Sequence, residues 1–139
     1  MMNYSIVQAH ELQFNMSLND EITAEFKKVI KMAFLFVLQY QKGNDASAIH
    51  SVVRFIHKDK VFFEGGVTLV FKSPVWDEMD KSEAFVRKSD FARELIAYSL
   101  PYLSGVMLAK TKGTPMESLM LPNIDASELV ENIKVEEVK

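Results

Sequence analysis

The feature that most constrains the fold of this chain is a long apolar stretch in its last third, expected to form one helix from about Phe91 towards Lys112. An ordinary surface helix buries a single apolar stripe. This helix has two, one made of Phe91, Leu95, Tyr98 and Tyr102 and the other made of Ile96, Leu100, Leu103 and Met107. Because each stripe must be covered, the helix is expected to have two packing partners.

Residues with known preferences mark the ends and the middle of this helix. Ser89 or Asp90 is a suitable N-cap, because a short polar side chain can accept a hydrogen bond from the first turn. Gly113 stands where a C-terminal cap glycine belongs. Pro101 removes one backbone donor and crowds the preceding turn, so a kink or break is expected near residues 97–100.

The first half of the chain alternates between apolar and polar residues with the two-residue period of strands. Strands are expected over residues 6–16, 31–40, 49–58 and 61–72, with a hairpin tip at residues 57–60. Strands joined in sequence by short turns pair antiparallel, which predicts a meander. The pair Gly65-Gly66 predicts a bulge or strong bend, since no Lys-Ser/Thr or helix start follows it to make a phosphate loop.

These elements predict a single α+β domain over residues 1–139. Its two layers would be a four-stranded antiparallel sheet and a cover formed by the long helix and a short C-terminal helix. The short helix is expected to open at Asp125-Ala-Ser-Glu128, which is similar to a capping box. Residues 135–139 are expected to be a frayed tail. With 139 residues, the chain can bury a substantial core without metals or disulfides.

Composition narrows the function. Cysteine is absent, which excludes disulfides, cysteine metal sites and cysteine nucleophiles. The first residues lack the basic and apolar regions of a signal peptide, and no run approaches the roughly 18 apolar residues of a membrane span, so we expect a cytoplasmic protein without membrane insertion. A net charge of −3 gives no basic field for nucleic acid. The one basic cluster, Lys27, Lys28 and Lys31, is more typical of a protected strand edge than of a nucleic-acid patch.

The search for catalytic chemistry is negative. His10, His50 and His57 fall on different expected strands or faces, so a metal site is not expected. The carboxylate pairs Asp77-Glu78 and Glu136-Glu137 fall in a loop and the tail, where a solvated surface is the favoured interpretation. The chain is therefore expected to have no catalytic residues and no cofactor.

Two motifs resemble the SecB family of export chaperones. Phe91-Ala-Arg-Glu-Leu-Ile96 is similar to that family's aromatic-Ala-Arg-Glu-x-Ile helix. Gly113-Thr-Pro-Met-Glu-Ser-Leu-Met-Leu-Pro-Asn-Ile-Asp125 is similar to its Gly-Thr-x-Pro-x-Leu-x-Leu-x-Pro-x-Asn segment. The resemblance implies a homotetramer, a dimer of dimers with helices between two sheets, and this would supply the second partner of the long helix.

The same resemblance implies a holdase, a molecular chaperone that binds unfolded or precursor polypeptides. It would serve protein export, with the translocase motor SecA as a possible recipient, or it would be the dedicated chaperone of an antitoxin. Two alternatives stay open. One is a non-catalytic oligomeric adaptor with a single protein partner, and the other is a small-molecule binding protein or enzyme with a closed pocket between helix and sheet.

Candidate client-binding residues are apolar side chains that the core does not have to consume: Trp76, Met79, Met116, Leu119, Met120, Leu35 and Val37. Trp76 is the best candidate, because a lone tryptophan in a polar loop is costly to expose without a use. For each of them the alternative is core or oligomer interface, and this alternative is favoured for Leu35 and Val37. The expected oligomer interface comprises Phe91, Leu95, Tyr98, Tyr102 and Met107.

Overall fold

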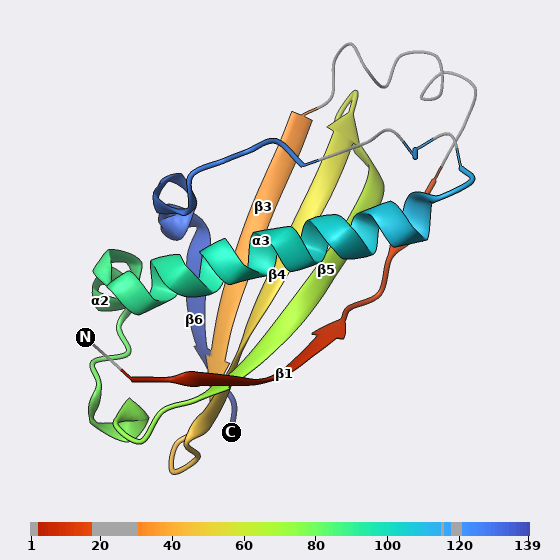
Figure 1. The fold of residues 1–139 in the computed structure, drawn as a ribbon. Helices are drawn as coiled ribbons and strands as arrows, with labels where there is room; N and C mark the ends of the chain where they lie inside the picture. The colour runs from red at the N-terminus through yellow and green to blue at the C-terminus, as the bar shows by residue number, and fades with distance from the viewer. Residues whose placement is uncertain (1–2, 18–30, 115, 118–120) are drawn as a thin grey trace.

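The structure is a computed structural model that describes residues 3–17, 31–114, 116–117 and 121–139. Its described part is an α+β fold with a six-stranded mixed sheet and two α-helices (Figure 1). The strands are β1 (Ser5–Glu11), β2 (Asn15–Met16), β3 (Lys31–Tyr40), β4 (Ala46–His57), β5 (Lys60–Lys72) and β6 (Ile133–Glu137). The helices are α2 (Glu83–Lys88) and α3 (Asp90–Thr111), and short 3-10 turns are η1 (Trp76–Glu78), η2 (Ala126–Glu128) and η3 (Val130–Asn132).

The sheet has the order β1-β5-β4-β3-β6, and β2 pairs with β5. Strands β3, β4 and β5 are antiparallel neighbours, as the meander predicts. The hairpin tip is also confirmed, because Lys58 and Asp59 have φ values of 50° and 64°, which a tight two-residue turn requires. Strand β1, however, pairs with β5 and not with β3. The expected strand over residues 6–16 is interrupted between β1 and β2.

The C-terminal segment corrects the expected four-stranded antiparallel sheet. Instead of a short helix and a frayed tail, it forms η2 and η3 and then β6, which pairs parallel with β3. Asp125 does act as a cap, but its side chain accepts a hydrogen bond from Ser127 N at 3.0 Å and starts only a 3-10 turn. Ile133 is fully buried and Val135 half-buried, so the period-two burial of a strand replaces the helical stripe.

Helix α3 is continuous through Pro101, so of the kink or break expected near residues 97–100, the break does not occur. Buried side chains on both sides of the proline, at Ser99 and Leu103, fix the helix against the sheet while Pro101 faces outward. The cap predictions are confirmed: Ser89 Oγ accepts from Ala92 N at 3.4 Å, and Gly113 has a φ of 79°. Helix α2 was not expected.

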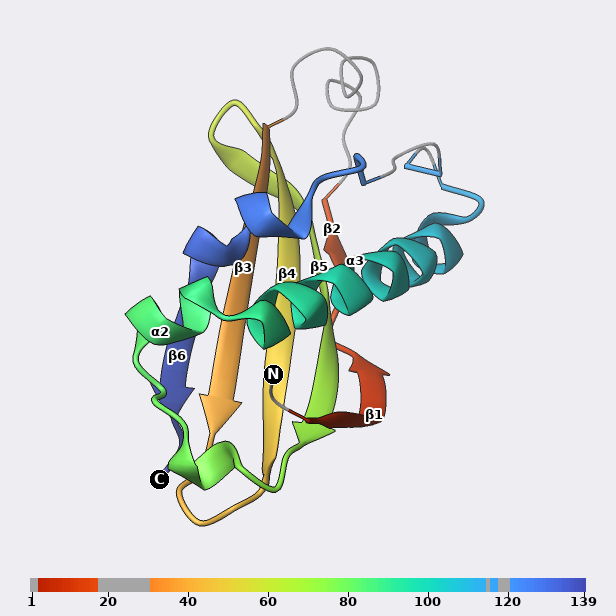
Figure 2. The same cartoon turned by 60° about the vertical axis from the view of Figure 1, so that its left-hand side comes forward.

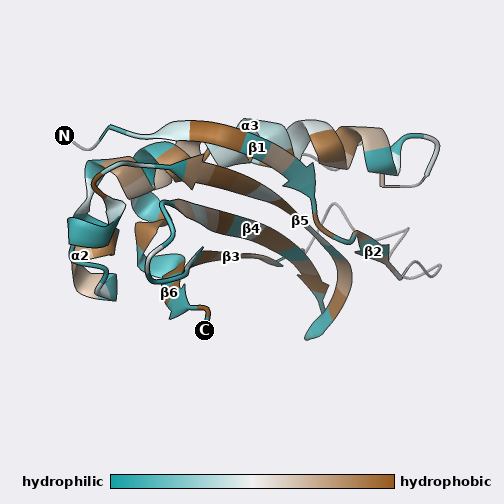
Figure 3. Ribbon diagram, turned by 90° about the horizontal axis from the view of Figure 1, so that it is seen from below, coloured by the Kyte–Doolittle hydropathy of each residue, from teal (hydrophilic) through white to brown (hydrophobic). Residues whose placement is uncertain are grey.

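Helix α3 crosses one face of the sheet and buries two apolar clusters there (Figures 1 and 2). The first cluster includes Trp76, Phe71 and Ile133, and the second includes Phe55 and Met107. Seen from below, the sheet curves under α3, with apolar stretches along β4 and β5 (Figure 3). The curvature lets the sheet contact a wide sector of the helix surface.

Gly65 and Gly66 allow close packing, and of the bulge or strong bend expected there, the bulge is not found in the pairing with β4. Pairing of β4 with β5 is regular at both glycines and shifts instead between Phe55 and Ile56. A Cβ atom on Gly66 would lie 2.7 Å from the Ser51 carbonyl oxygen, and one on Gly65 would collide with the ring of Phe14. The glycines therefore allow the N-terminal segment and β4 to approach β5 closely.

Candidate binding groove

A groove of about 420 Å³ runs between the outer side of α3 and the segment of residues 121–126. Its lining contains no charged side chain and consists of Ala97, Leu100, Pro101, Ser104, Leu121, Pro122, Asn123, Ile124 and Ala126. From position 97 to position 104 the helix wall rises about 10 Å, at 1.5 Å per residue. That length matches about three residues of an extended polypeptide.

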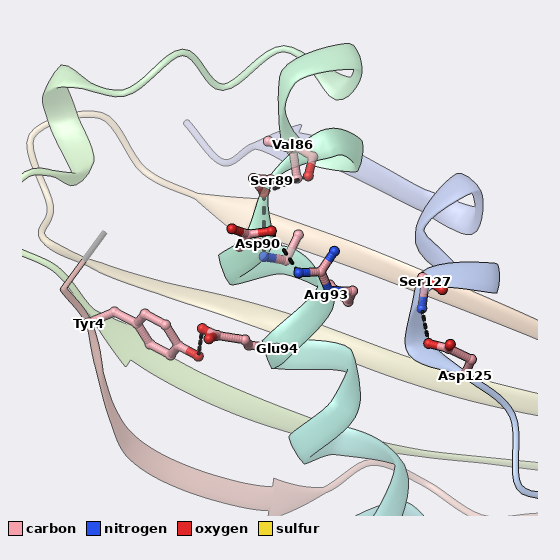
Figure 4. A network of polar contacts seen from close by, with 9 residues as sticks. Tyr4, Val86, Ser89, Asp90, Arg93, Glu94, Asp125 and Ser127 are labelled. Carbon is pink, nitrogen blue, oxygen red and sulfur yellow. Dashed lines mark hydrogen bonds and ion pairs between the residues drawn. The ribbon is translucent and has the colours of Figure 1, made fainter. Parts of the chain in front are cut away.

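The wall opposite α3 is the second half of the Gly113–Asp125 motif. Leu121 packs against the second apolar cluster and Ile124 against the first, so the segment is anchored at two points. Pro122 and Asn123 between them are exposed. Asp125 fixes the end of the segment through Ser127 N (Figure 4). This backbone hydrogen bond lowers the pKa of the Asp125 carboxyl.

The α3 wall belongs to an uncharged stretch that extends from Leu95 to Ala109. On this stretch Tyr98 is 56% exposed and Leu108 is 42% exposed. An apolar helix surface that the described residues leave exposed is a common property of interaction sites.

Polar contacts hold both ends of the uncharged stretch. At its start, Tyr4 donates a hydrogen bond to Glu94 Oε2 at 3.0 Å (Figure 4). Burial, and then the neighbouring Glu94 carboxylate, raises the pKa of the Tyr4 hydroxyl. At its end, Lys110 Nζ lies 2.9 Å from Glu11 Oε2. Both partners of the helix belong to the N-terminal segment, so β1 lies beside α3.

Trp76, the best candidate for client contact, is buried, with only 1% of its surface exposed. Its ring makes edge contacts with Phe71, Phe91 and Tyr40 at centroid distances of 5.4, 5.9 and 6.1 Å. Lys81 Nζ lies 5.3 Å from the centre of the same ring. The loop around Trp76 is polar, but η1 turns the side chain into the first cluster, so the prediction of a client contact at Trp76 is wrong.

The other client candidates are dispersed. Met116 is fully buried in the second cluster, and Met79 is half-buried against the first. Leu35 and Val37 are half-buried on the face of β3 that points away from α3. Leu119 and Met120 lie outside the described residues. The structure therefore brings none of the described candidates into the groove.

The expected oligomer interface needs a similar correction. Phe91, Leu95 and Met107 are buried inside the chain, and Tyr102 packs against both clusters. Only Tyr98 among these five is exposed. The reason is that the curved sheet covers much of both apolar stripes of α3.

The groove residues that sequence reasoning missed are small or conformationally special, such as Ala97, Pro101 and Pro122. An analysis of hydrophobic periodicity does not detect such residues, because its signal comes from large apolar side chains. The signal that could have found them is the absence of charge from Leu95 to Ala109, which includes the side of the helix that faces away from the sheet.

Among the described residues, no group of three or more His, Cys, Asp or Glu side chains is placed to hold a metal ion. No described helix combines the length and the apolar character that crossing a membrane would require. The groove offers apolar surface and uncharged polar groups, and this arrangement supports binding by burial and hydrogen bonding.

No family model matches this chain, and no curated protein matches it. Among solved structures, the chain is similar to a protein of unknown function from Streptococcus agalactiae. The two share 16% sequence identity over 90% of this chain and 97% of that chain, with a TM-score of 0.43.

Proposed function

We propose that this chain is a client-holding chaperone that binds uncharged apolar segments of unfolded polypeptides in the groove between α3 and residues 121–126. The observation that carries the proposal is a groove, about 420 Å³ in volume, whose described lining residues are all uncharged. Burying a client's apolar side chains there would release their hydration, whereas a charged side chain would lose water without gaining a partner.

The SecB-like fold assignment belongs to the same proposal. The end of the Gly113–Asp125 segment, from Leu121 onward, supplies one groove wall, and α3 supplies the other from Ala97 onward. The first motif, Phe91–Ile96, lies on the same helix just before the groove, and its apolar residues pack in the core. Export through SecA and service to an antitoxin are the two routes by which a held client would be delivered.

We further propose that the chain is a homo-oligomer, and the two edges of its sheet support this. At the β6 edge, the Arg87 side chain donates two hydrogen bonds to the Ile133 carbonyl, at 3.0 and 2.9 Å. Glu83 Oε1 accepts a hydrogen bond from Val135 N at 3.2 Å. Helix α2 therefore occupies outward backbone groups of β6 and closes that edge against further strands.

The β1 edge is open by comparison. All seven β1 residues are exposed, and no described residue hydrogen-bonds to the strand on the side away from β5. Ile6 and Val7 are 39% and 45% exposed. If two β1 strands paired antiparallel about a twofold axis at Gln8, Glu11 would face Ser5, so no like charges would meet. A second copy of the chain therefore fits this edge, in the first step towards the proposed tetramer.

The chaperone proposal is tested by measuring suppression of the aggregation of an unrelated unfolded protein, together with binding of a labelled apolar peptide. The Ala97→Glu variant places a carboxylate in the groove on an exposed helix position. We expect it to weaken peptide binding by about tenfold or more. Ala109→Glu makes the same change on α3 outside the groove lining and should leave binding nearly unchanged.

Three results would contradict the proposal. A wild-type chain that suppresses no aggregation and binds no apolar peptide would refute client holding. Equal peptide affinities for the two glutamate variants would place the binding surface elsewhere. Tight binding to one folded protein at fixed stoichiometry, without suppression of aggregation, would support the adaptor alternative.

A further inference from the structure

The groove contains a backbone acceptor that α3 cannot satisfy. Pro101 lies inside the helix and has no N–H group, so the carbonyl of Ala97, four residues earlier, lacks its usual donor. Between α3 and the other described residues, no backbone hydrogen bond reaches that carbonyl. Ala97 and Pro101 are both exposed and both line the groove. The carbonyl without its usual donor therefore belongs to residues that border the cleft.

The opposite wall also has unpaired backbone groups. No hydrogen bond joins the backbone of residues 121–124 to any described residue. The segment has no regular secondary structure and is held by its side chains, with Leu121 and Ile124 in the two clusters. Within the described part of the chain, its N–H and C=O groups have no backbone partner and can face an extended partner, except at Pro122, which has no N–H.

A proline within a continuous helix is unfavourable relative to alanine. Helix α3 nevertheless continues through position 101, with buried residues on either side, so the proline does not end the helix. One local effect of the proline is to deprive the Ala97 carbonyl, on the helix side that borders the groove, of its usual donor.

We propose that the Ala97 carbonyl and the backbone of residues 121–124 bind the main chain of an extended, uncharged client segment about three residues long. This inference rests on the proposed function and specifies its binding mode. The uncharged lining selects against charged segments. A client N–H would satisfy the carbonyl, whereas a hydrocarbon ligand would cover it and leave it unpaired. Binding would then depend on backbone conformation more than on client sequence.

The test uses the full chain and an end-capped apolar peptide with lysine pairs at both ends and a fluorescent label. A series of peptides carries one N-methylated amide at each central position in turn, which removes one donor at a time. We expect at least one N-methylation to weaken binding to the wild-type chain about tenfold or more. The Pro101→Ala variant restores the helix N–H to Ala97 and should bind the parent peptide about tenfold more weakly.

A double-mutant cycle separates the hydrogen bond from loss of the proline ring. If the carbonyl is the contact, the harmful N-methylation should have little further effect in Pro101→Ala. Ser104→Ala, which changes a side chain of the same wall, should preserve the N-methyl pattern. Wild-type binding that is indifferent to every N-methylation, or an additive cycle, would overturn this inference and leave client holding intact. Absence of any peptide binding would overturn the proposed function and this inference together.

Discussion

Glu11, the last residue of β1, lies 2.9 Å from Lys110 near the end of α3, with its Oε2 atom facing the lysine Nζ. The contact between Tyr4 and Glu94 ties the other end of the same two segments. The helix rises about 24 Å between its two contact points, and the extended chain covers about 23 Å between its own. Strand β1 therefore runs along one side of α3 while the groove occupies another.

The first prediction concerns assembly along β1. The chain has no cysteine, so a single introduced cysteine reports contacts without background. Twofold pairing near Gln8 would bring the Gln8→Cys residues of two copies together, and we expect an oxidised dimer on non-reducing gels. Val138 is also exposed, but it follows the last residue of β6 and lies outside the proposed interface. The Val138→Cys variant should therefore stay largely monomeric in the same assay. A monomeric wild-type chain in light scattering would contradict this prediction.

Two glycine substitutions should have opposite effects on stability. Gly66→Ala would place a methyl group 2.7 Å from the Ser51 carbonyl oxygen, so we expect a loss of about 1–3 kcal/mol in the free energy of unfolding. Gly105→Ala adds its methyl group on an exposed helix position with nothing within 4 Å. There we expect a gain of roughly 0.5–1 kcal/mol. Urea denaturation measures both, and destabilisation by Gly105→Ala would show that the outer face of α3 is covered.

The burial of Trp76 predicts a specific fluorescence signature. Trp76 is the only tryptophan, so emission reports on one site. A side chain that is 1% exposed should emit at short wavelength and resist quenching by acrylamide until the chain unfolds. Addition of an apolar peptide should leave the emission unchanged, because the groove lining excludes Trp76. Efficient quenching in the native state would contradict this placement.

Removing the Trp76 side chain should strongly destabilise the folded chain. Trp76→Ala would leave a cavity between Phe71, Phe91 and Tyr40, and we expect a loss of about 3–5 kcal/mol in the free energy of unfolding. The conservative Trp76→Phe variant keeps most of the apolar volume and should be affected less. Equal stabilities for the two variants in thermal melts would be inconsistent with a packed core at this position.

A histidine on the sheet face opposite α3 should make stability depend on pH. His50 Nδ1 lies 2.7 Å from Thr68 Oγ1, and Nε2 lies 2.7 Å from Gln39 Oε1. Burial lowers the pKa of His50, and positive charge on His10 lowers it further, while Glu136 opposes the shift. The folded chain therefore binds this proton more weakly than the unfolded chain does.

The direction in which stability changes with pH follows from that difference in proton binding. The contribution of His50 is fully present above the unfolded pKa, near the usual value of about 6.5, and is lost as the pH falls towards the lower folded value. Titration by NMR should give His50 a pKa below that usual value, and His10→Gln should raise it. The urea midpoint should fall less between pH 7.5 and 5.5 in His50→Gln than in the wild-type chain. A His50 pKa above the usual value would reverse the expected sign.

Sequence patterns located the elements whose signals are local. The hairpin of β4 and β5 follows from alternation and the turn at Lys58 and Asp59, and the start and end of α3 follow from Ser89 and Gly113. Strand β6 was missed because Asp125-Ala-Ser-Glu128 carries a helix-start signal that extends only to a short turn. Helix α2 was missed because its six residues offer too short a window for periodicity.

The candidate site was less predictable than the fold. The client candidates Leu119 and Met120 directly precede residues 121–126 in the sequence, and the structure places residues 121–126 in one groove wall. Large side chains that the sequence suggested as client contacts are instead buried in the core, as Trp76 and Met116 show. Small residues such as Ala97 and Pro101 remained at the surface to line the groove. Size and hydrophobicity favour burial, so they identify the core better than a binding surface.

The sequence by itself determined the periods, the caps and the uncharged stretch from Leu95 to Ala109, because each depends on residues close together in the chain. Only the tertiary structure decided which apolar surfaces stay uncovered. It set β1 beside α3, added β6 parallel to β3, and turned Trp76 inward. Those outcomes depend on contacts between segments distant in sequence, because the apolar surface of one element must be buried against another element of the fold.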